Sequence, residues 1–539
     1  VGAFPPVWKD ELYLEEHRGV HTTKALLKKY NRYCENLYRK AEMFSSIATK
    51  YGFEYPLEKL NEGWQMILTN QFHDSLPGSH ITEVFGDLCE IYKKIIAIGE
   101  EVLSDALNAI AGNSGVKTDL GKPFALFNAL SKPASNKVEL PFKEVAVFDS
   151  EGNAVPTQSY TKLDGTKVLT FVAKAVPAAG FKVYYTKDAA VKEAEIADES
   201  ALDSNRFSLK FNDRAELVSL YDKKNSREVL SGTGNVFRIY EDLPGKYDAW
   251  DIVATYVDRE FETKPGKIES IKKGDVFTVV SVSKDINKST LKQNIIIYNE
   301  LDRIDFDTFI SWHEQEKLLK VGFDVDIKAQ KFTRDIAYAT IESSNYRHNP
   351  YDKAKFEVSA HNFIDMSEDG YGLSILNDCK YGFEVDGQRM IITLLKAPMN
   401  PDPQSDRGDH YFTYSLYPHA GNWKDAETLV RGLELNNRFD VKELPEGNGV
   451  FEKSFMSVNG KNVTLEAVKK CEDSDAFIVR FVEKSGRRTN VGFTFFADIK
   501  EAFECDLLER NDVPVNSFGG NSLNFEIKPF EIKCFKLKI

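Results

Sequence analysis

The chain has 539 residues, of which 42% are hydrophobic and 28% charged, and its formal net charge is -13 at pH 7. One hydrophobic core does not extend over such a length, so we expect about three or four domains. The acidic balance argues against a nucleic-acid partner, because a surface that binds nucleic acid needs clustered basic residues to displace counterions.

Three further features bear on the compartment of the protein. No apolar run approaches the ~20 residues that a membrane-spanning helix needs, so we expect no membrane partner. No signal peptide or lipidation motif is visible at the N-terminus. The cysteines are widely scattered and form no CxxC motif, which is typical of small buried side chains in a reducing compartment. We therefore expect a cytoplasmic protein. The six cysteines are Cys34, Cys89, Cys379, Cys471, Cys505 and Cys534.

Residues 1–112 carry helical periodicity. Apolar residues from Leu26 to Ala48 follow one another at spacings of three and four, and a second stripe runs from Val84 to Leu107. Between these stripes, a shorter series predicts a helix with one buried face that ends at a Pro-Gly break. The shorter series consists of Trp64, Ile67, Leu68, Gln71 and Phe72. The three stripes predict an N-terminal three-helix bundle.

From about residue 120 the pattern changes to short β-rich runs separated by turn signals. Examples are 145–148, 207–211, 276–280 and 477–481. A stretch rich in Ala, Glu, Asp and Lys, after Lys187 and through about Ser200, is interpreted as a linker or a solvated excursion. We predict an α+β multidomain protein in which three β-sandwiches follow the helices. The expected domains are 1–112 (helical), 120–190 (small β-sandwich), 200–440 (large β-sandwich) and 445–539 (C-terminal β-sandwich).

The segment Asn70–Ser79 holds a histidine and a carboxylate side by side at the predicted helix end. Neutral imidazole is a good zinc ligand, and an adjacent carboxylate can accept hydrogen bonds from hydroxyl groups or tune a metal. By themselves His73 and Asp74 carry little weight, because a histidine at a helix end more often bonds to the backbone.

The surrounding residues strengthen the interpretation of this segment. Gln71-Phe72-His73-Asp74 and Leu76-Pro77-Gly78-Ser79 resemble the signature of the glycoside hydrolase family 38 α-mannosidases, in the branch with cytosolic, vacuolar and bacterial members. Further matches occur in the same order along nearly the whole chain. They include Glu11-Leu12-Tyr13-Leu14-Glu15, Tyr247-Asp248-Ala249-Trp250-Asp251-Ile252, Leu376-Asn377-Asp378-Cys379-Lys380-Tyr381-Gly382, Asp406, His410 and Pro529-Phe530-Glu531-Ile532-Lys533.

The resemblance implies a site and a substrate class. In the family a divalent ion, usually zinc, binds a histidine and two aspartates of an N-terminal α/β barrel and the histidine that His73 matches. Asp74 matches a residue at the mannose subsite, and Tyr247 and Asp251 are candidates for the rim of that subsite. The expected reaction is retaining hydrolysis of terminal α-mannosyl residues of glycans. The resemblance also implies that the large sandwich is galactose-mutarotase-like.

The barrel is expected to lie outside this chain, because the family match begins only a few residues after Val1. A catalytic zinc takes about three protein ligands, so His73 alone does not make the site. We therefore expect no catalytic residue in this chain and no activity of the chain alone. A partner polypeptide or a lost segment would supply the barrel, and zinc or another divalent ion such as cobalt would be shared with it. An oligomer is also expected.

Other interpretations stay open. His17 and His21, four residues apart, could present two ligands on one helix face, although no third ligand is evident nearby. His410, His419 and Asp406 are expected to order loops. The chain could be a non-catalytic carbohydrate-binding or scaffolding subunit. A lyase or mutarotase-like enzyme would need an acid and a base within residues 200–440, where the sequence offers no convincing pair.

Overall fold

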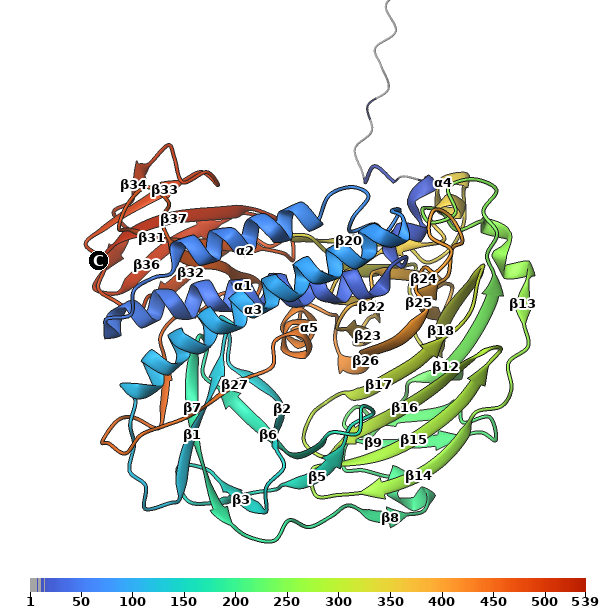
Figure 1. Ribbon diagram of the computed structural model, residues 1–539, viewed down its shortest axis with the longest axis horizontal. Helices are drawn as coiled ribbons and strands as arrows, with labels where there is room; N and C mark the ends of the chain where they lie inside the picture. Colours follow the sequence, from blue (N-terminus) through green and yellow to red (C-terminus); the bar gives the residue numbers. More distant parts are fainter. Residues whose placement is uncertain (1–6, 8–10, 14) are drawn as a thin grey trace, which may run out of the picture.

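The computed structural model describes residues 7, 11–13 and 15–539, and the side chain of residue 201 is left out. Three long helices come first and are followed by a chain that is almost entirely β (Figure 1). The α-helices are α1 (Ala25–Ala48), α2 (Leu57–Asn70), α3 (Thr82–Gly112), α4 (Pro350–Ala354) and α5 (Thr428–Asn436). Among the described residues, no helix combines the length and the apolar character needed to cross a membrane.

The long helices pack closely because glycines on α2 and α3 lie against the Tyr38 ring of α1. The hydroxyl of Tyr38 on α1 donates a hydrogen bond to the carbonyl of Ile95 at 2.9 Å. A Cβ on Gly63 of α2 would lie 1.9 Å from the Tyr38 hydroxyl, and a Cβ on Gly99 of α3 would lie 2.8 Å from the same ring. Any larger residue at Gly63 would therefore push α2 away from α1.

A small sandwich follows the helices. The sheet order β27-β1-β7-β3-β4, with β28 paired to β7, faces the sheet β2-β6-β5 across a shared core. The first sheet contains β1 (Lys122–Asn128), β3 (Val145–Phe148), β4 (Ala154–Val155), β7 (Gly180–Asp188), β27 (Asp440–Glu443) and β28 (Glu452–Ser454). The second contains β2 (Ala134–Pro141), β5 (Gln158–Thr161) and β6 (Lys167–Val176).

The large sandwich is built from a nine-stranded and a ten-stranded antiparallel sheet, and Phe306 and Phe323 meet between them with ring centroids 5.9 Å apart. The nine-stranded sheet contains β9 (Phe207–Phe211), β10 (Leu217–Asp222), β11 (Arg227–Glu228), β12 (Leu230–Glu241), β13 (Glu260–Phe261), β18 (Lys317–Val325), β21 (Val358–Ser359), β24 (Gly382–Asp386) and β25 (Arg389–Lys396). The ten-stranded sheet contains β8 (Glu195–Ala197), β14 (Lys267–Lys273), β15 (Phe277–Ile286), β16 (Ser289–Tyr298), β17 (Ile304–Trp312), β19 (Lys331–Ile336), β20 (Ala339–Ser344), β22 (Phe363–Glu368), β23 (Tyr371–Asn377) and β26 (Gly408–Ala420).

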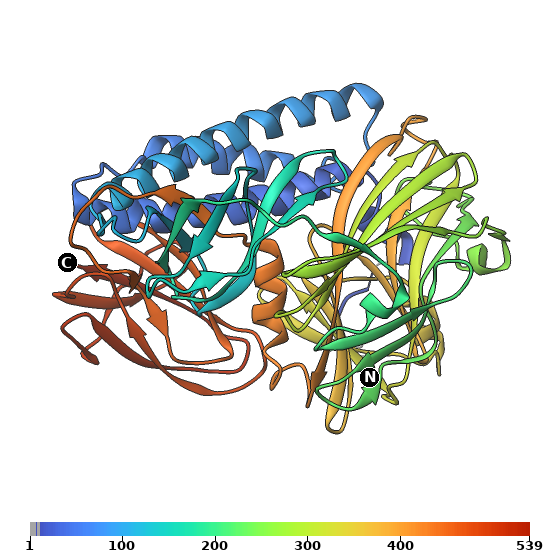
Figure 2. The ribbon, with the colours of Figure 1, turned by 90° about the horizontal axis from the view of Figure 1, so that it is seen from below.

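A third sandwich ends the chain, and Phe481 and Phe493 pack between its sheets with ring centroids 4.9 Å apart. Its sheets contain β29 (Ser457–Val458), β32 (Thr489–Thr494), β35 (Phe518–Gly519) and β36 (Ser522–Ile527), and β30 (Val463–Lys470), β31 (Phe477–Glu483), β33 (Glu501–Cys505), β34 (Val513–Pro514) and β37 (Ile532–Lys538). In Figure 2 the helices extend along one side, from this sandwich toward the large one. One continuous core joins the helices to the third sandwich.

Most predicted elements are confirmed, and N-terminal helices followed by β-sandwich sheets are the observed architecture. The predicted buried face of the second helix is wrong in part, because α2 ends at Asn70 and both Leu68 (62% exposed) and Phe72 (60%) face solvent. The predicted linker contains β8, which pairs with β14. After the large sandwich, the chain returns to the small one, where β27 pairs with β1 and β28 pairs with β7. The small sandwich is therefore built from two separate segments of the chain, whereas each expected domain was one continuous range.

Candidate functional site

The turn that follows α2 presents His73 and Asp74 to solvent. Their side chains are 72% and 46% exposed, and His73 Nε2 lies 3.4 Å from Asp74 Oδ2. The hydroxyl of Ser79 donates to Asp74 Oδ1 at 2.8 Å, and the ring of Phe72 lies 4.3 Å from the imidazole. Gly78 closes the turn with φ +91°, a conformation that glycine adopts at little cost. The histidine and the carboxylate are thus adjacent and accessible, and they lie on a turn with a defined backbone conformation.

A buried lysine holds this turn against α1. Lys28 Nζ donates to the carbonyls of Leu76 at 2.7 Å and Pro77 at 3.0 Å, and also to the carbonyl of Thr23. An ammonium group has three donors, so three carbonyl acceptors satisfy it. Burial lowers the pKa of Lys28 to about 7. At the start of the turn, the Gln71 amide donates to Glu35 at 2.8 Å.

A loop from the large sandwich meets the start of α1 from the other side. Lys24 precedes α1 with φ 58° and offers no capping side chain of its own. Asp406 supplies the cap, because its carboxylate accepts the backbone N–H groups of Lys24 at 2.5 Å and Ala25 at 2.7 Å. His410 Nε2 in turn lies 2.7 Å from the Asp406 carbonyl. Asp406 and His410 therefore order this junction.

Asp402 links the same loop to two helices. Its carboxylate accepts hydrogen bonds from the Lys24 ammonium, next to α1, and from the Thr82 hydroxyl at the start of α3. Burial alone would raise the pKa of Asp402, but the hydrogen bonds from Lys24 and Thr82 lower it. The carboxylate therefore stays ionised, and it joins the start of α1 to the start of α3, the helix that follows the turn bearing His73.

We expect Asp406→Ala to lower the free energy of unfolding by about 1 kcal/mol, because two N–H groups at the start of α1 lose their acceptor. The urea midpoint and amide hydrogen exchange in the first turn of α1 measure this change. Asp409→Ala is the matched control, because Asp409 is exposed and lies only three residues further on. Equal effects of the two substitutions would contradict the assignment of Asp406 as the cap.

Tyr247 and Asp251 lie in a loop that packs on the N-terminal segment. Tyr247 is exposed and stacks on Trp250, with ring centroids 5.7 Å apart. Asp251 forms an ion pair with Arg18 at 3.3 Å, and the Trp250 carbonyl accepts the Gly19 N–H at 2.6 Å. Tyr247 is therefore accessible to a ligand, whereas Asp251 is engaged by a structural arginine.

The two parts of the predicted site are tied to one scaffold. Asp248 accepts the N–H of Met399 at 2.6 Å, and the same loop carries Asp402, which reaches α1 and α3. Described hydrogen bonds and ion pairs join His73 to Asp74 but neither of them to Tyr247 or Asp251. The sequence did not single out Lys28 or Asp402, since a charged residue on a helix or in a loop more often faces solvent.

The described residues can supply one ligand to a metal ion, but they do not form a complete metal site. An exposed imidazole beside a carboxylate is a suitable ligand for a divalent ion. Among the described residues, no group of three or more His, Cys, Asp or Glu could hold a metal ion. His17 and His21 end two separate 3-10 helices rather than sharing one helix face, and burial lowers the pKa of His21 to about 3. Further ligands would have to lie outside the described residues.

Three domain models match the chain. A model of the alpha mannosidase middle domain matches residues 15–110 and covers α1 to α3. A model of the glycosyl hydrolases family 38 C-terminal domain matches residues 202–404 in the large sandwich. A model of the glycosyl hydrolases family 38 C-terminal beta sandwich domain matches residues 462–535.

Whole-chain relatives agree with these models. Alpha-mannosidase G of Dictyostelium discoideum is 31% identical over 98% of this chain and 52% of its own length. Alpha-mannosidase 2C1 of Homo sapiens is 30% identical over 97% of this chain and 50% of its own length. The crystal structure of an alpha-mannosidase from Enterococcus faecalis shares the fold, with a TM-score of 0.79, 15% identity, and coverage of 97% of this chain and 68% of that one. The chain spans about half the length of the curated relatives it matches, and it belongs to glycosyl hydrolase family 38, of which it carries the middle and C-terminal domains.

Proposed function

We propose that the chain is part of a retaining, zinc-dependent α-mannosidase that removes terminal α-mannosyl residues from glycans. In this proposal His73 is one metal ligand, and Asp74, Tyr247 and Asp251 contact the sugar. One observation carries the proposal: His73 and Asp74 are adjacent and exposed on a turn that the buried Lys28 and the half-buried Glu35 hold in place. The names of the relatives, all alpha-mannosidases, support the substrate class.

The chain's own residues would bind and orient rather than cleave. Lys28 fixes the carbonyls of the turn, and the His73 imidazole on this turn is exposed to solvent. Asp74, held by Ser79, keeps carboxylate lone pairs free to accept hydrogen bonds from sugar hydroxyls. When bound, zinc would act as a Lewis acid and would orient vicinal hydroxyls of mannose. Cobalt is an alternative ion.

The remaining metal ligands, the nucleophile and the general acid are proposed to come from an N-terminal barrel outside this chain. The surface around His73 supports this. Leu68, Phe72 and Ile81 are large apolar side chains that are more than half exposed near the turn. Clustered exposed apolar residues indicate a surface that another domain or subunit covers. A barrel seated here would bring its ligands next to His73.

The test compares this chain with a longer protein or complex that contains the barrel. We expect the longer enzyme to hydrolyse an aryl α-mannoside and the pure chain to show no turnover, because a retaining mechanism needs two carboxylates flanking the bond. Hydrolysis by rigorously purified chain would contradict the proposal. If the barrel-containing protein neither binds a divalent ion nor hydrolyses mannosides, a carbohydrate-binding or scaffolding subunit becomes the better description.

Further parts of the proposal concern architecture and location. We propose that α1 to α3 form a three-helix bundle, which the packing of Tyr38 against Gly63 and Gly99 supports. A galactose-mutarotase-like large sandwich is proposed on the basis of its two broad antiparallel sheets. A cytoplasmic location is supported by six free cysteines, five of them buried. Assembly into an oligomer and the lack of a membrane or nucleic-acid partner stay predictions.

A further inference from the structure

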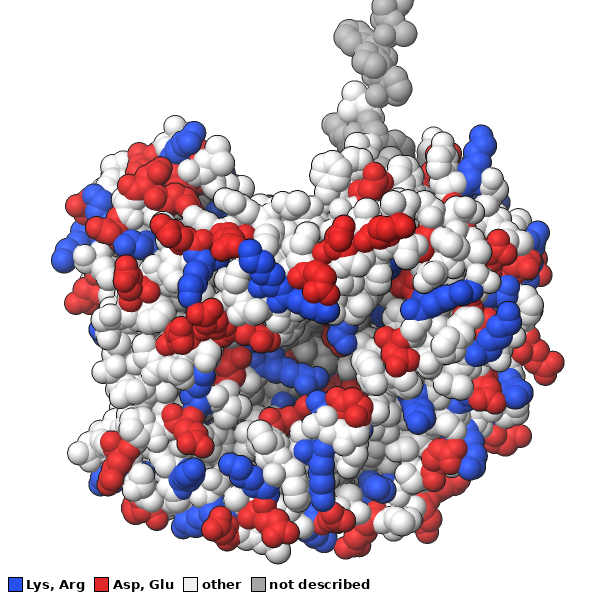
Figure 3. Space-filling view, viewed as in Figure 1, with Lys and Arg blue, Asp and Glu red and all other residues white. Residues whose placement is uncertain are grey.

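The three sandwiches and α5 enclose a cavity of about 470 Å³. Figure 3 shows a hollow near the centre of the face seen in Figure 1, with acidic and basic side chains around it. The small sandwich contributes Ser135, the turn between β16 and β17 contributes residues 300–303, and the third sandwich contributes Lys461. None of the cavity's described lining residues belongs to the segments 70–82, 247–251 or 399–406. The cavity is therefore separate from the site around His73.

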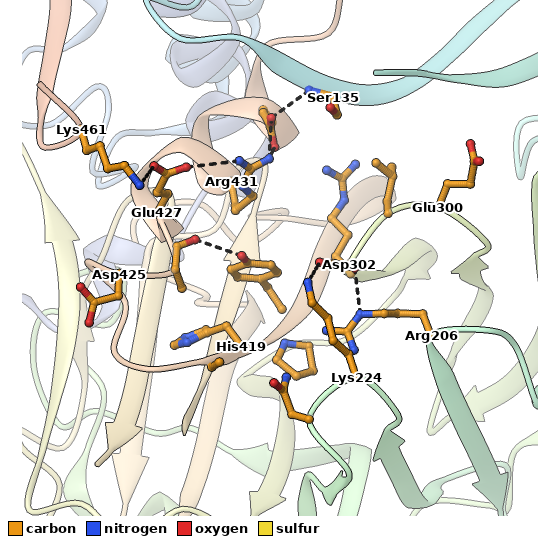
Figure 4. Close-up of a pocket in the computed structure, with 18 residues that line it drawn as sticks. Ser135, Arg206, Lys224, Glu300, Asp302, His419, Asp425, Glu427, Arg431 and Lys461 are labelled. Carbon is orange, nitrogen blue, oxygen red and sulfur yellow. Dashed lines mark hydrogen bonds and ion pairs between the residues drawn. The ribbon is translucent and has the colours of Figure 1, made fainter. Parts of the chain in front are cut away.

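The charges that line the cavity are balanced and paired (Figure 4). Five lining residues are basic and five are acidic. The pairs include Arg206–Asp302 (2.8 Å), Lys224–Asp302 (3.0 Å), Arg303–Asp305 (2.8 Å), Arg431–Glu434 (2.6 Å), Lys461–Glu427 (3.1 Å) and Lys174–Glu300 (2.7 Å). An anion gains little from cations that are already neutralised, and a metal ion finds no cluster of open ligands among the described residues. Charged ligands are thus disfavoured.

Unused donors and acceptors remain on the walls. Arg206 and Arg303 are only 9% and 5% exposed, and both line the cavity. Among the described residues, Arg206 Nη2 and Arg303 Nη1 have no hydrogen-bond partner, although the other nitrogens of both groups are bonded. Asp425 and Glu300 each add one carboxylate oxygen, since Asn422 donates to the other oxygen of Asp425 and Lys174 donates to the other oxygen of Glu300. The apolar lining is limited to Leu301, Pro418, Ala420, Ala426 and the ring of Tyr417, and the other lining residues are polar or charged. A lipid or other apolar ligand is therefore also disfavoured.

We propose that this cavity binds a short neutral saccharide. Each sugar hydroxyl both donates and accepts a hydrogen bond, so it can use guanidinium N–H groups and carboxylate oxygens together. The volume lies within the range of about 300 to 1,000 Å³ that small-molecule pockets show. The ligand class follows from the cavity alone, whereas the choice of a mannose-containing probe rests on the proposed function.

The test is saturation-transfer NMR of the chain with α-mannobiose, with maltose as a second neutral disaccharide and inorganic phosphate as a charged probe. We expect transfer to a disaccharide in the unsubstituted chain. Ala420→Trp, which places an indole at the cavity wall, should weaken the signal at least tenfold. Ala190→Trp is the matched control, because Ala190 is exposed and does not line the cavity. Binding should also persist in a His73→Ala/Asp74→Ala variant.

Each outcome decides the proposal. Binding of maltose but not mannobiose would uphold the cavity site and would count against mannose as its ligand. Binding of neither disaccharide, binding of phosphate that Ala420→Trp abolishes, or full binding by Ala420→Trp would overturn it. Loss of binding in the His73→Ala/Asp74→Ala variant would also overturn it, since the sugar would then occupy the other site. Thermal unfolding checks that Ala420→Trp folds; if it does not, Glu300→Leu replaces it.

Discussion

Replacing His73 by alanine in the enzyme that contains the barrel is expected to remove the bound divalent ion and to lower kcat/KM by at least about 100-fold. Loss of a partner that only orients a metal ligand typically costs 10- to 100-fold in affinity or activity, so loss of a ligand itself should cost at least as much. The fold should survive, because the His73 side chain is 72% exposed and packs mainly on Phe72. Metal analysis of the purified variant and steady-state kinetics measure the two effects.

His313→Ala is the matched control for this experiment. His313 is also exposed and contacts a hydroxyl, that of Ser311 at 3.1 Å, but it lies in the large sandwich, in the loop directly after β17. This control should keep its ion and its activity. An unchanged ion content in His73→Ala would refute the assignment of His73 as a ligand, whatever happened to the activity.

Replacing Lys320 by methionine is expected to destabilise the large sandwich by about 3 to 5 kcal/mol, because it leaves buried carboxylates without their cation. Lys320 Nζ lies 2.6 Å from Glu357 Oε2 and 2.8 Å from Glu384 Oε2, and all three side chains are buried. The Tyr256 hydroxyl also donates to Glu384 at 2.5 Å. Urea unfolding followed by a probe in the large sandwich measures the loss.

Lys331→Met is the control for that substitution. Lys331 pairs with Glu342 at 3.1 Å in the same sandwich, but both side chains are more than 60% exposed. Water and side-chain entropy reduce such a pair to less than about 1 kcal/mol. Similar losses of stability in Lys320→Met and Lys331→Met would contradict the claim that burial makes the Lys320 ion pairs more important for stability than an exposed pair.

The same cluster bears on the lyase or mutarotase-like interpretation. That enzyme needs an acid and a base between residues 200 and 440, and Lys320, Glu357, Glu384 and Tyr256 form a close cluster of titratable groups there. Their side chains are buried among the strands, so a substrate does not reach them. The cluster is structural, and this interpretation gains no support from it.

The spacing of apolar residues and the positions of turn-forming residues predicted most helices and strands correctly. The stripe from Leu26 to Ala48 became α1, and the run at 207–211 became β9 with the same bounds. The apolar face of α2 was predicted less well. Periodicity indicates that Leu68 and Phe72 share a face with buried residues, but it does not indicate which surface covers that face. Both side chains face solvent beside His73, where we propose that the barrel binds.

The sequence predicted only those parts of the candidate site whose residues are close together in the chain. His73 and Asp74 are neighbours in the sequence, so their pairing needs no tertiary information. Lys28 reaches carbonyls 48 and 49 residues away, and Asp406 caps a helix 382 residues away. Such contacts depend on how domains pack, and neither a lysine inside a helix nor an aspartate in a loop carries a periodic signal. The support for the His73 turn therefore became visible only in the structure.

Native mass spectrometry of the protein as isolated from its source tests the central claim most directly. The account predicts that the 61.1 kDa of this chain are found together with a barrel, in one longer polypeptide or as a second subunit, and that the particle carries one divalent ion per site. A lone species of 61.1 kDa without metal would contradict the account, because His73 would then have no partner ligands with which to hold an ion.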